Sequence, residues 1–341
     1  MFKEIELSGS AQERGFEHGK TLRTSIEHVL NYYLSIFGLR EQQVFLQAKH
    51  FRQVIRNFSP SIADEVEHIA EGASVDPLFI YALNARSEIL NNSVLGPSVS
   101  ECTALFCQRS GLLMQNWDWS EALEPLVVLM RMNLENGHKI CQLTEPGIVG
   151  KIGLNNAGIG VCLNILKTAQ VLKGVPVHIL LRRALESQSF VASRQVLQRN
   201  SEGKASHLLL AAAGGACHSV EFCGPRACEL SPHNDLLIHT NHYLDETAAG
   251  LDAFPSTHER FARAGSLCEQ SRGNDGLSVE AAQALLLDRT EGELSINRAY
   301  SPSLTPGFGR VGTVFSIIMD LRQGVFWVRP GSSEVFTQLA V

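Results

Sequence analysis

The sequence predicts an α+β fold, a four-layer αββα sandwich in which helices cover the outer faces of two stacked antiparallel sheets. From residue 102 onward the strand-like segments come in pairs joined by short turns, a pattern typical of antiparallel sheets. Two helical blocks accompany them, and their apolar faces need sheet surfaces to cover. Because the chain has no internal repeat and no long linker, we expect one compact globular unit.

The first hundred residues indicate helices. Residues 10–35 carry an amphipathic pattern. Ser59 and Asp76 each precede a proline, so each offers an N-cap and an N1 proline to the helical segment that follows it. In the second of these segments we expect Arg86 to pair with Glu88. The helical pattern breaks at residues 95–100, where glycine and proline occur.

Hairpins dominate the rest of the chain. We expect three in succession, TALFCQ with LLMQNWDW, VVLMRMNL with ICQLTE, and KIGLNN with GIGVCLNIL. Asn136 and Gly137 favour a tight turn at the tip of the second hairpin. The further expected elements are helices at HILLRRALES and VASRQVLQRN, strands within 207–242, helices at 257–270 and 278–288, and a closing hairpin in TVFSIIMDLRQGVFWVRPG.

Composition excludes several classes of function. Of the 341 residues, 44% are hydrophobic and 19% are charged, which is ordinary for a globular protein. A formal charge of −6 argues against nucleic acid as a partner, since phosphate binding needs clustered Lys and Arg. The amino-terminal residues show no secretion signal and no run of 18 apolar residues occurs, so we expect a cytoplasmic protein with no membrane contact.

The eight cysteines form no C-x-x-C pair. In a cytoplasmic context they are expected to stay reduced, most of them as buried thiols. Cysteines and histidines gather between Cys217 and His242, but their spacing matches no common zinc pattern. We therefore expect no metal and no cofactor.

Cys102 admits two interpretations. It stands at the head of the strand-like run CTALFC, where a core thiol would suit the apolar residues that follow it. A nucleophile exposed by cutting the chain just before residue 102 would suit the same position. The residues of this segment alone do not decide between them.

Ordered motifs along nearly the whole chain resemble the isopenicillin-N acyltransferase type (acyl-CoA:6-aminopenicillanic acid acyltransferase-like) of N-terminal-nucleophile hydrolases. The motifs are LSGSAQERGFEHGK, IAEGASVDPLFIYALNARSEI, CTALFCQ with MQNWDW, LTEPGIVGKIGLNNAGIGVCLNIL, GVPVHILLRRALES, IHTNHYL, and INRAY followed by GRVGTVFSIIMD. One such motif is weak evidence, but this many in the family's order is specific.

The resemblance implies that the chain cuts its own bond between Glu101 and Cys102. Residues 1–101 are then a helical pro-segment that remains bound as a small subunit, and residues 102–341 are the large, nucleophile-bearing subunit. The resemblance also implies the αββα fold reached above.

Four catalytic residues carry over by motif position. Cys102 is the nucleophile, and Asn241 in HTNH matches the oxyanion-hole asparagine. Asp118 in NWDW matches an acidic residue that orients or stabilises the new α-amino group. Arg310, before VGTVF, matches an arginine that keeps the surroundings of the thiolate electropositive.

Three departures from the family pattern stand out. Glu101 precedes the cysteine where many relatives have glycine. Gly307 to Arg310 lacks the serine that the penicillin-making member carries there, which weakens the case for the same substrate. Gln115 stands where the bile-salt-hydrolase branch has an arginine, so the chain leans toward the acyltransferases.

An amino-terminal cysteine carries its nucleophile and its base on one residue. Its free α-amine, with an ordinary pKa of about 7.7 to 8.0, can accept the thiol proton, whereas the amide nitrogen of an internal cysteine cannot. The resulting acyl-enzyme serves hydrolysis and acyl transfer alike. The expected partners are a small-molecule amide, an N-acyl amino acid or an acyl-CoA, together with the chain's own cleaved N-terminal segment; the oligomeric state is not predicted.

Two other functions stay open. The chain could be an unprocessed, non-catalytic relative that binds small amides. It could also be a protease with an internal Cys-His pair, for which His239 or His242 would have to supply the imidazole.

Overall fold

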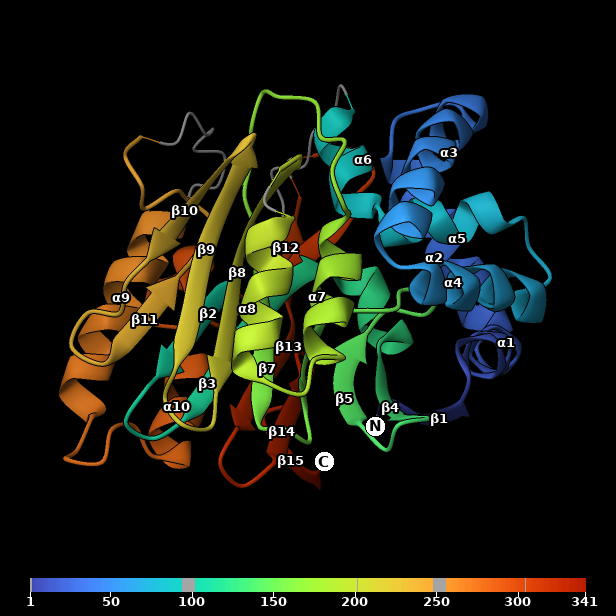
Figure 1. The fold of residues 1–341 in the computed structure, drawn as a ribbon. Coiled ribbons are helices and arrows are strands. Elements are labelled where there is room, and N and C mark those ends of the chain that lie inside the picture. The colour runs from blue at the N-terminus through green and yellow to red at the C-terminus, as the bar shows by residue number, and fades with distance from the viewer. Residues whose placement is uncertain (1, 94–101, 201, 248–255, 304) are drawn as a thin grey trace.

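Two stacked sheets form the centre of the molecule (Figure 1). The computed structural model describes residues 2–93, 102–200, 202–247, 256–303 and 305–341. Helices α7 and α8 cover the outer face of one sheet, and α9 and α10 cover the outer face of the other. The side chain of Gln115 joins the sheets, because it donates to the carbonyl oxygen of Leu163 (2.5 Å) and accepts from its N–H (3.0 Å). The predicted αββα order of layers is confirmed.

The first sheet has eight strands in the order β1-β4-β5-β6-β7-β8-β9-β10, antiparallel except for the β1–β4 pair. Their bounds are β1 Lys3–Gly9, β4 Val128–Leu134, β5 Lys139–Thr144, β6 Ile152–Asn155, β7 Ile159–Ile165, β8 Lys204–Ala212, β9 Cys217–Gly224 and β10 Arg226–Leu230. The β4–β5 hairpin turns at Gly137, whose φ of 78° lies in the left-handed region that glycine enters without a steric cost.

The second sheet has the order β11-β2-β3-β13-β14-β15, with β12 paired to β13. Its strands are β2 Thr103–Cys107, β3 Leu112–Ser120, β11 Leu236–His239, β12 Ser301–Pro302, β13 Arg310–Asp320, β14 Val325–Pro330 and β15 Thr337–Ala340. Thr103 pairs with Asn116, so the head of β2 lies against the second half of β3. All four predicted hairpins are confirmed.

The helices of the two outer layers begin and end close to the predicted residues. They are α7 Val177–Leu185 and α8 Phe190–Arg199 on the first sheet, and α9 Thr257–Ser271 and α10 Val279–Leu286 on the second. Short 3₁₀ helices occur at Glu121–Leu126 (η1) and Gly292–Leu294 (η2).

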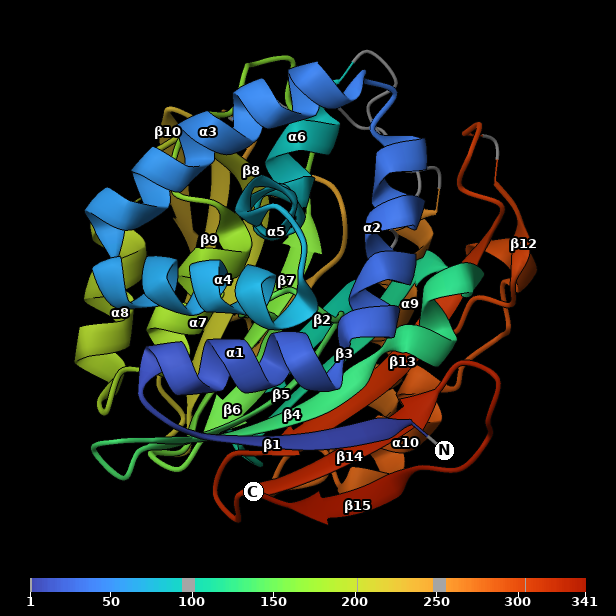
Figure 2. The same cartoon turned by 90° about the vertical axis from the view of Figure 1, so that its right-hand side faces the viewer.

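Six helices before residue 94 form a separate block, which faces the viewer in Figure 2. They are α1 Ala11–Thr21, α2 Arg23–Ile36, α3 Glu41–Phe58, α4 Pro60–Ala73, α5 Pro77–Asn84 and α6 Arg86–Asn92. The side chains of Ser59 and Asp76 cap α4 and α5 as predicted. The prediction of helix alone is wrong for residues 3–9, which form β1 and pair in parallel with β4.

Buried contacts join the helical block to the sheets. Glu65 of α4 accepts two hydrogen bonds from Arg182 of α7 (2.8 and 2.7 Å) and one from Arg14 of α1 (2.9 Å). Within the block, α1 and α4 touch backbone to backbone, since a Cβ on Gly19 would lie 2.1 Å from the carbonyl oxygen of Ile69. The N-terminal segment is thereby an integral part of the fold.

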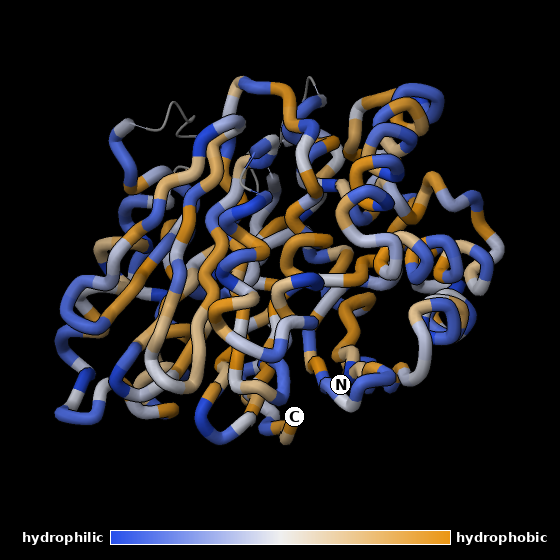
Figure 3. The backbone as a smooth tube through the Cα atoms, in the orientation of Figure 1, coloured by the Kyte–Doolittle hydropathy of each residue, from blue (hydrophilic) through white to orange (hydrophobic). Residues whose placement is uncertain are grey.

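Apolar residues run along the central strands, where Figure 3 shows long orange stretches of the tube, and also through the N-terminal helices. One core cluster fills the space between the sheets and under the N-terminal block, and a smaller one lies between the second sheet and helices α9 and α10. Among the described residues, no helix combines the length and the apolar character needed to cross a bilayer.

Candidate active site

Cys102 lies directly before β2 and is 3% exposed. Its thiol points toward the space between the sheets, because Ala104 and Phe106 on the same side of β2 belong to the inter-sheet core. The Sγ atom lies 4.0 Å from the main-chain oxygen of Asp118. It lines a cavity of about 10 Å³, room for about one water molecule. Glu101, the other residue of the expected cleavage site, lies outside the described residues.

The carbonyl oxygen of Cys102 is held by two side chains. Arg260 of α9 donates to it from Nη1 at 2.7 Å, and Asn164 of β7 donates from Nδ2 at 3.0 Å. Arg260 also donates to the hydroxyl of Thr103 (3.0 Å). The position of residue 102 is therefore fixed from both a helix and the neighbouring sheet.

The guanidinium of Arg260 links Cys102 to Asn241. Its Nη2 donates to Oδ1 of Asn241 at 3.0 Å, while Nη1 donates to the Cys102 carbonyl. Asn241 is fully buried, and its Nδ2 donates to the carbonyl oxygen of Ile165 (2.9 Å). The structure thus brings together two of the predicted residues, Cys102 and Asn241, and orients the amide so that its nitrogen faces away from Arg260.

Sequence reasoning missed Arg260. Its helix reads as an amphipathic surface helix, in which an arginine is usually taken as solvent-facing. The signal was its spacing, because Thr257, Arg260, Ala264 and Cys268 follow the helical period and are the buried residues of α9. Arg260 is itself 0% exposed.

Asp118 is close to Cys102 through its backbone, but its side chain lies on the other face of β3. Trp117 and Trp119 belong to the inter-sheet core, so the alternation of the strand directs Asp118 toward the layer of α9 and α10. Burial lowers the pKa of Arg329, and the Asp118 carboxylate acts in the opposite direction. Arg329 bonds Ser316 on that same outer face. The structure therefore does not bring the Asp118 carboxylate to the thiol.

Arg310 begins β13, and its side chain is 55% exposed. It forms an ion pair with Glu121 (3.2 Å) and donates to the carbonyl oxygen of Tyr300 (2.8 Å). It is not among the residues that line the Cys102 cavity. Its predicted role rests on the motif match alone.

Charged residues surround the thiol side of Cys102. Arg86 and Lys151 line the same cavity, and both donate to Oε2 of the buried Glu145, at 3.0 and 2.5 Å. Tyr33 of α2 donates to the other oxygen of Glu145. The expected Arg86–Glu88 ion pair is replaced by the Arg86–Glu145 pair.

The pKa values of this cluster follow from burial and mutual charge. Burial raises the pKa of Glu145, but Arg86 and Lys151 outweigh it and bring it to about 2. Burial lowers the pKa of Lys151 to about 7, although Glu145 acts in the opposite direction. Motif matching pointed to none of these three side chains as part of the site.

Both ring nitrogens of His239 already have partners. Nε2 bonds Glu221 (2.7 Å), Nδ1 bonds the carbonyl oxygen of Thr240 (2.7 Å), and the ring stacks on His207 with 3.6 Å between centroids. In His242, Nδ1 lies within hydrogen-bond distance of the hydroxyls of Thr240 and Thr257. These contacts disfavour the protease alternative, which needs an imidazole bonded to the thiol.

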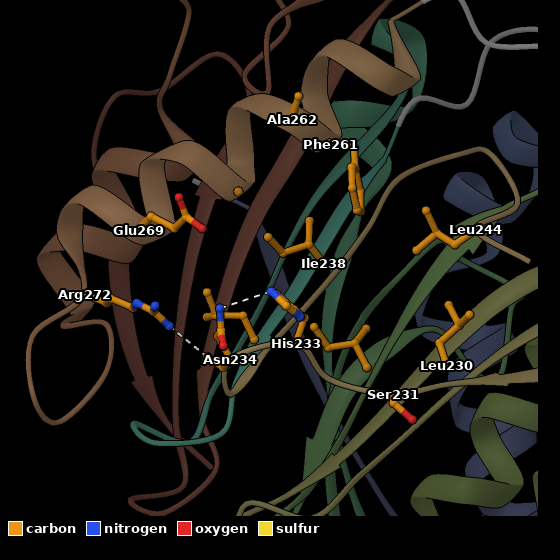
Figure 4. Close-up of a pocket in the computed structure, with 13 residues that line it drawn as sticks. Leu230, Ser231, His233, Asn234, Ile238, Leu244, Phe261, Ala262, Glu269 and Arg272 are labelled. Atoms are coloured by element: carbon orange, nitrogen blue, oxygen red, sulfur yellow. Dashed lines mark hydrogen bonds between the residues drawn. The ribbon is translucent and has the colours of Figure 1, made fainter.

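A larger groove lies between β11 and α9 (Figure 4). It encloses about 290 Å³, and Ile238, Leu244 and Phe261 form part of its apolar wall. Near one end, Arg272 donates to the carbonyl oxygen of Asn234 (2.8 Å), as a dashed line marks. The lining contains none of the four predicted catalytic residues.

Comparison with known proteins gives a matching family model and a similar relative. The family model of acyl-coenzyme A:6-aminopenicillanic acid acyl-transferase matches residues 107–334. The acyl-coenzyme A:6-aminopenicillanic-acid-acyltransferase 40 kDa form of Emericella nidulans is 28% identical over an alignment of 327 residues that covers 93% of this chain and 89% of the relative.

Two solved structures also match. A variant of conjugated bile acid hydrolase from Clostridium perfringens has a TM-score of 0.49 at 12% identity and covers 71% of this chain and 92% of its own. Penicillin V acylase from Agrobacterium tumefaciens has a TM-score of 0.38 at 11% identity and covers 70% of this chain and 86% of its own.

Proposed function

Since the chain belongs to the acyl-coenzyme A:6-aminopenicillanic acid acyl-transferase family, we propose that it is a self-processing acyltransferase and amidohydrolase with Cys102 as its nucleophile. Cleavage between Glu101 and Cys102 frees an α-amine, and the thiol then attacks the carbonyl carbon of a linear amide or an acyl thioester. The product of this attack is a thioester at Cys102. An acceptor amine takes the acyl group in transfer, and water takes it in hydrolysis.

The observation that carries the proposal is the single guanidinium that binds both Cys102 and Asn241. Arg260 donates to the Cys102 carbonyl and to Oδ1 of Asn241, so these residues lie within the span of one side chain. Because Arg260 binds Oδ1 of Asn241, Nδ2 is the group of this side chain that can donate to an oxyanion. An amide N–H aimed at a developing oxyanion typically contributes about 3 kcal/mol to transition-state stabilisation.

The α-amine of the processed chain supplies the base. Before cleavage the nitrogen of Cys102 belongs to an amide. After cleavage it is a free α-amine, whose ordinary pKa is near 8. We propose that Asp118 holds the α-ammonium form of the processed chain. Its carboxylate lies on the outer face of β3 in the uncleaved chain. We propose that Arg310 acts on the thiolate. To do so, its side chain must leave its ion pair with Glu121.

Covalent labelling tests this function. Purified protein is mixed with phenylacetyl-CoA or octanoyl-CoA, and the mass of the fragment that begins at Cys102 is measured. We expect that fragment to gain the mass of the acyl group and to lose it on treatment with hydroxylamine, as a thioester does. Cys102→Ala should stay unlabelled. Label on another residue, or an intact chain that binds an amide without turnover, would favour the non-catalytic alternative.

A further inference from the structure

The first cleavage poses a problem of proton transfer that later turnovers do not have. The inference drawn from this problem rests on the proposed self-processing, in which the thiol of Cys102 attacks the carbonyl carbon of the peptide bond that precedes Cys102. At that stage the nitrogen of Cys102 is still an amide and cannot accept the thiol proton. Another group has to take this proton if a thiolate is to form near neutral pH.

Lys151 lies on the thiol side of Cys102. Both residues line the same small cavity, and Lys151 is 2% exposed. Two contacts hold its amine in place, because Nζ donates to Glu145 (2.5 Å) and lies 3.2 Å from the centroid of the Trp117 ring. The ammonium is therefore placed by the fold rather than free to swing into solvent.

The charges around Lys151 allow it to lose a proton near neutral pH. Burial and Arg86 lower the pKa of Lys151, Glu145 and the Cys102 thiolate raise it, and the balance lies at about 7. Its neutral and protonated forms are then both populated under physiological conditions. The titratable or charged side chains that interact with it are Glu145, Arg86 of α6, His178 of α7 and Cys102, and Tyr33 of α2 bonds the other oxygen of Glu145.

The other charged groups of this cluster cannot serve as the base. Arg86 stays protonated at any useful pH. Glu145 has a pKa of about 2 and is engaged by three donors. Burial lowers the pKa of His178 well below its ordinary value, and its Nδ1 bonds the carbonyl oxygen of Gly150 (2.9 Å).

We propose that Lys151 is the proton acceptor of the Cys102 thiol in the uncleaved chain. The thiol proton moves to the neutral Nζ, and Sγ bonds to the carbonyl carbon of the preceding residue. The C–N bond to Cys102 then breaks, and the leaving nitrogen takes the proton back from the Lys151 ammonium. The resulting thioester is hydrolysed by water, which leaves a carboxylate on the first fragment and a free thiol and amine on the second.

The wild-type chain gives the first test, through the rate of self-cleavage from pH 6 to pH 9.5. We expect the rate to rise with pH, because deprotonation of Lys151 creates the base, and to level off above about pH 7.5. Without a lysine base the rate should keep rising toward the ordinary thiol pKa of about 8.5. A rate that climbs without a plateau, or that does not change with pH, would overturn the proposal.

Substitutions of Lys151 give the second test. Lys151→Arg keeps the positive charge but cannot give up a proton, and Lys151→Met removes both the charge and the amine that serves as the base. We expect each to cleave about 10²- to 10⁴-fold more slowly than wild type, the range of general-base catalysis. Methylamine added to Lys151→Ala should restore part of the rate. Lys204→Met is the matched control, a second buried lysine whose Nζ donates to the carbonyl oxygen of Glu202 (2.8 Å).

The outcomes separate this inference from the proposed function. A wild-type chain that never cleaves contradicts self-processing itself. If the wild type cleaves itself and folded Lys151→Arg and Lys151→Met cleave at the wild-type rate, the role of Lys151 alone is contradicted. If Lys204→Met slows cleavage as much as the Lys151 variants do, the effect belongs to buried lysines in general and the inference falls.

Discussion

The carbonyl oxygen and the thiol of Cys102 lie in surroundings of different kinds. On the carbonyl side, Arg260 and Asn164 donate hydrogen bonds to one fixed acceptor. On the thiol side, Glu145 binds Arg86 and Lys151 in a buried charge cluster closed by the N-terminal helices. The first arrangement fixes a position, whereas the second can exchange a proton. The two sides can therefore be disturbed separately, with different expected results.

Arg260→Met should give the largest effect. It removes one of the two donors to the Cys102 carbonyl and the hydrogen bonds from Arg260 to Thr103 and Asn241, and each buried acceptor left without a partner costs about 1–3 kcal/mol. We expect a loss of several kcal/mol in the free energy of unfolding, measured in urea, together with a loss of self-cleavage. Arg263→Met, on the same helix but in a partly exposed pair with Asp288, is the control. Equal stability of the two variants would contradict the carbonyl-side role.

Asn241→Ala should lower kcat by about 10²- to 10³-fold, the effect of removing one oxyanion donor. Asn241→Asp sharpens the test, because it keeps an acceptor for Arg260 and removes the N–H. Both should be measured on fully cleaved protein, since a failure of processing would imitate a catalytic defect. If kcat is unchanged and only the melting temperature falls, Asn241 is structural.

Glu145→Gln tests the thiol side through the pH dependence of stability. The pKa of Glu145 is about 2, against an ordinary 4.5, so its charge stabilises the fold above pH 4.5. That contribution, on the order of 3 kcal/mol, is lost as the pH falls from 4.5 toward 2. We expect wild type to melt well above Glu145→Gln at pH 7 and the difference to shrink by pH 3. A difference independent of pH would contradict the charge cluster.

Arg310→Gln should have the smallest effect. An exposed ion pair such as Arg310–Glu121 contributes about 0.2–1 kcal/mol, so the melting temperature should change little. Turnover of the cleaved protein decides its catalytic role. A fall of more than tenfold in kcat/KM at unchanged stability would show that Arg310 reaches the site after processing, as the motif match implies.

Local signals made much of the fold predictable. The capping residues of α4 and α5 and the turn at Gly137 act within a few residues, so they are visible in the sequence. β1 was missed because its partner β4 lies more than a hundred residues further on. Its alternation, with Ile5 and Leu7 buried between exposed neighbours, was the available signal.

The candidate site was less predictable, because its side chains meet only through tertiary structure. Cys102 and Asn241 were found by motif position and do lie together. Lys151 and Glu145 come from a loop after β5, and Arg86 comes from α6, so no sequence spacing joins them. Arg260 reads as an ordinary charge on a helix until the buried face of α9 is known.

The intact mass of the purified chain over time tests the central claim most directly. If Cys102 frees its own amino group, the 37.4 kDa chain should give two species whose masses sum to that of the chain plus one water, the larger beginning at residue 102. Cys102→Ala should remain a single species. A wild-type chain that stays whole while it turns over an acyl substrate would contradict the account.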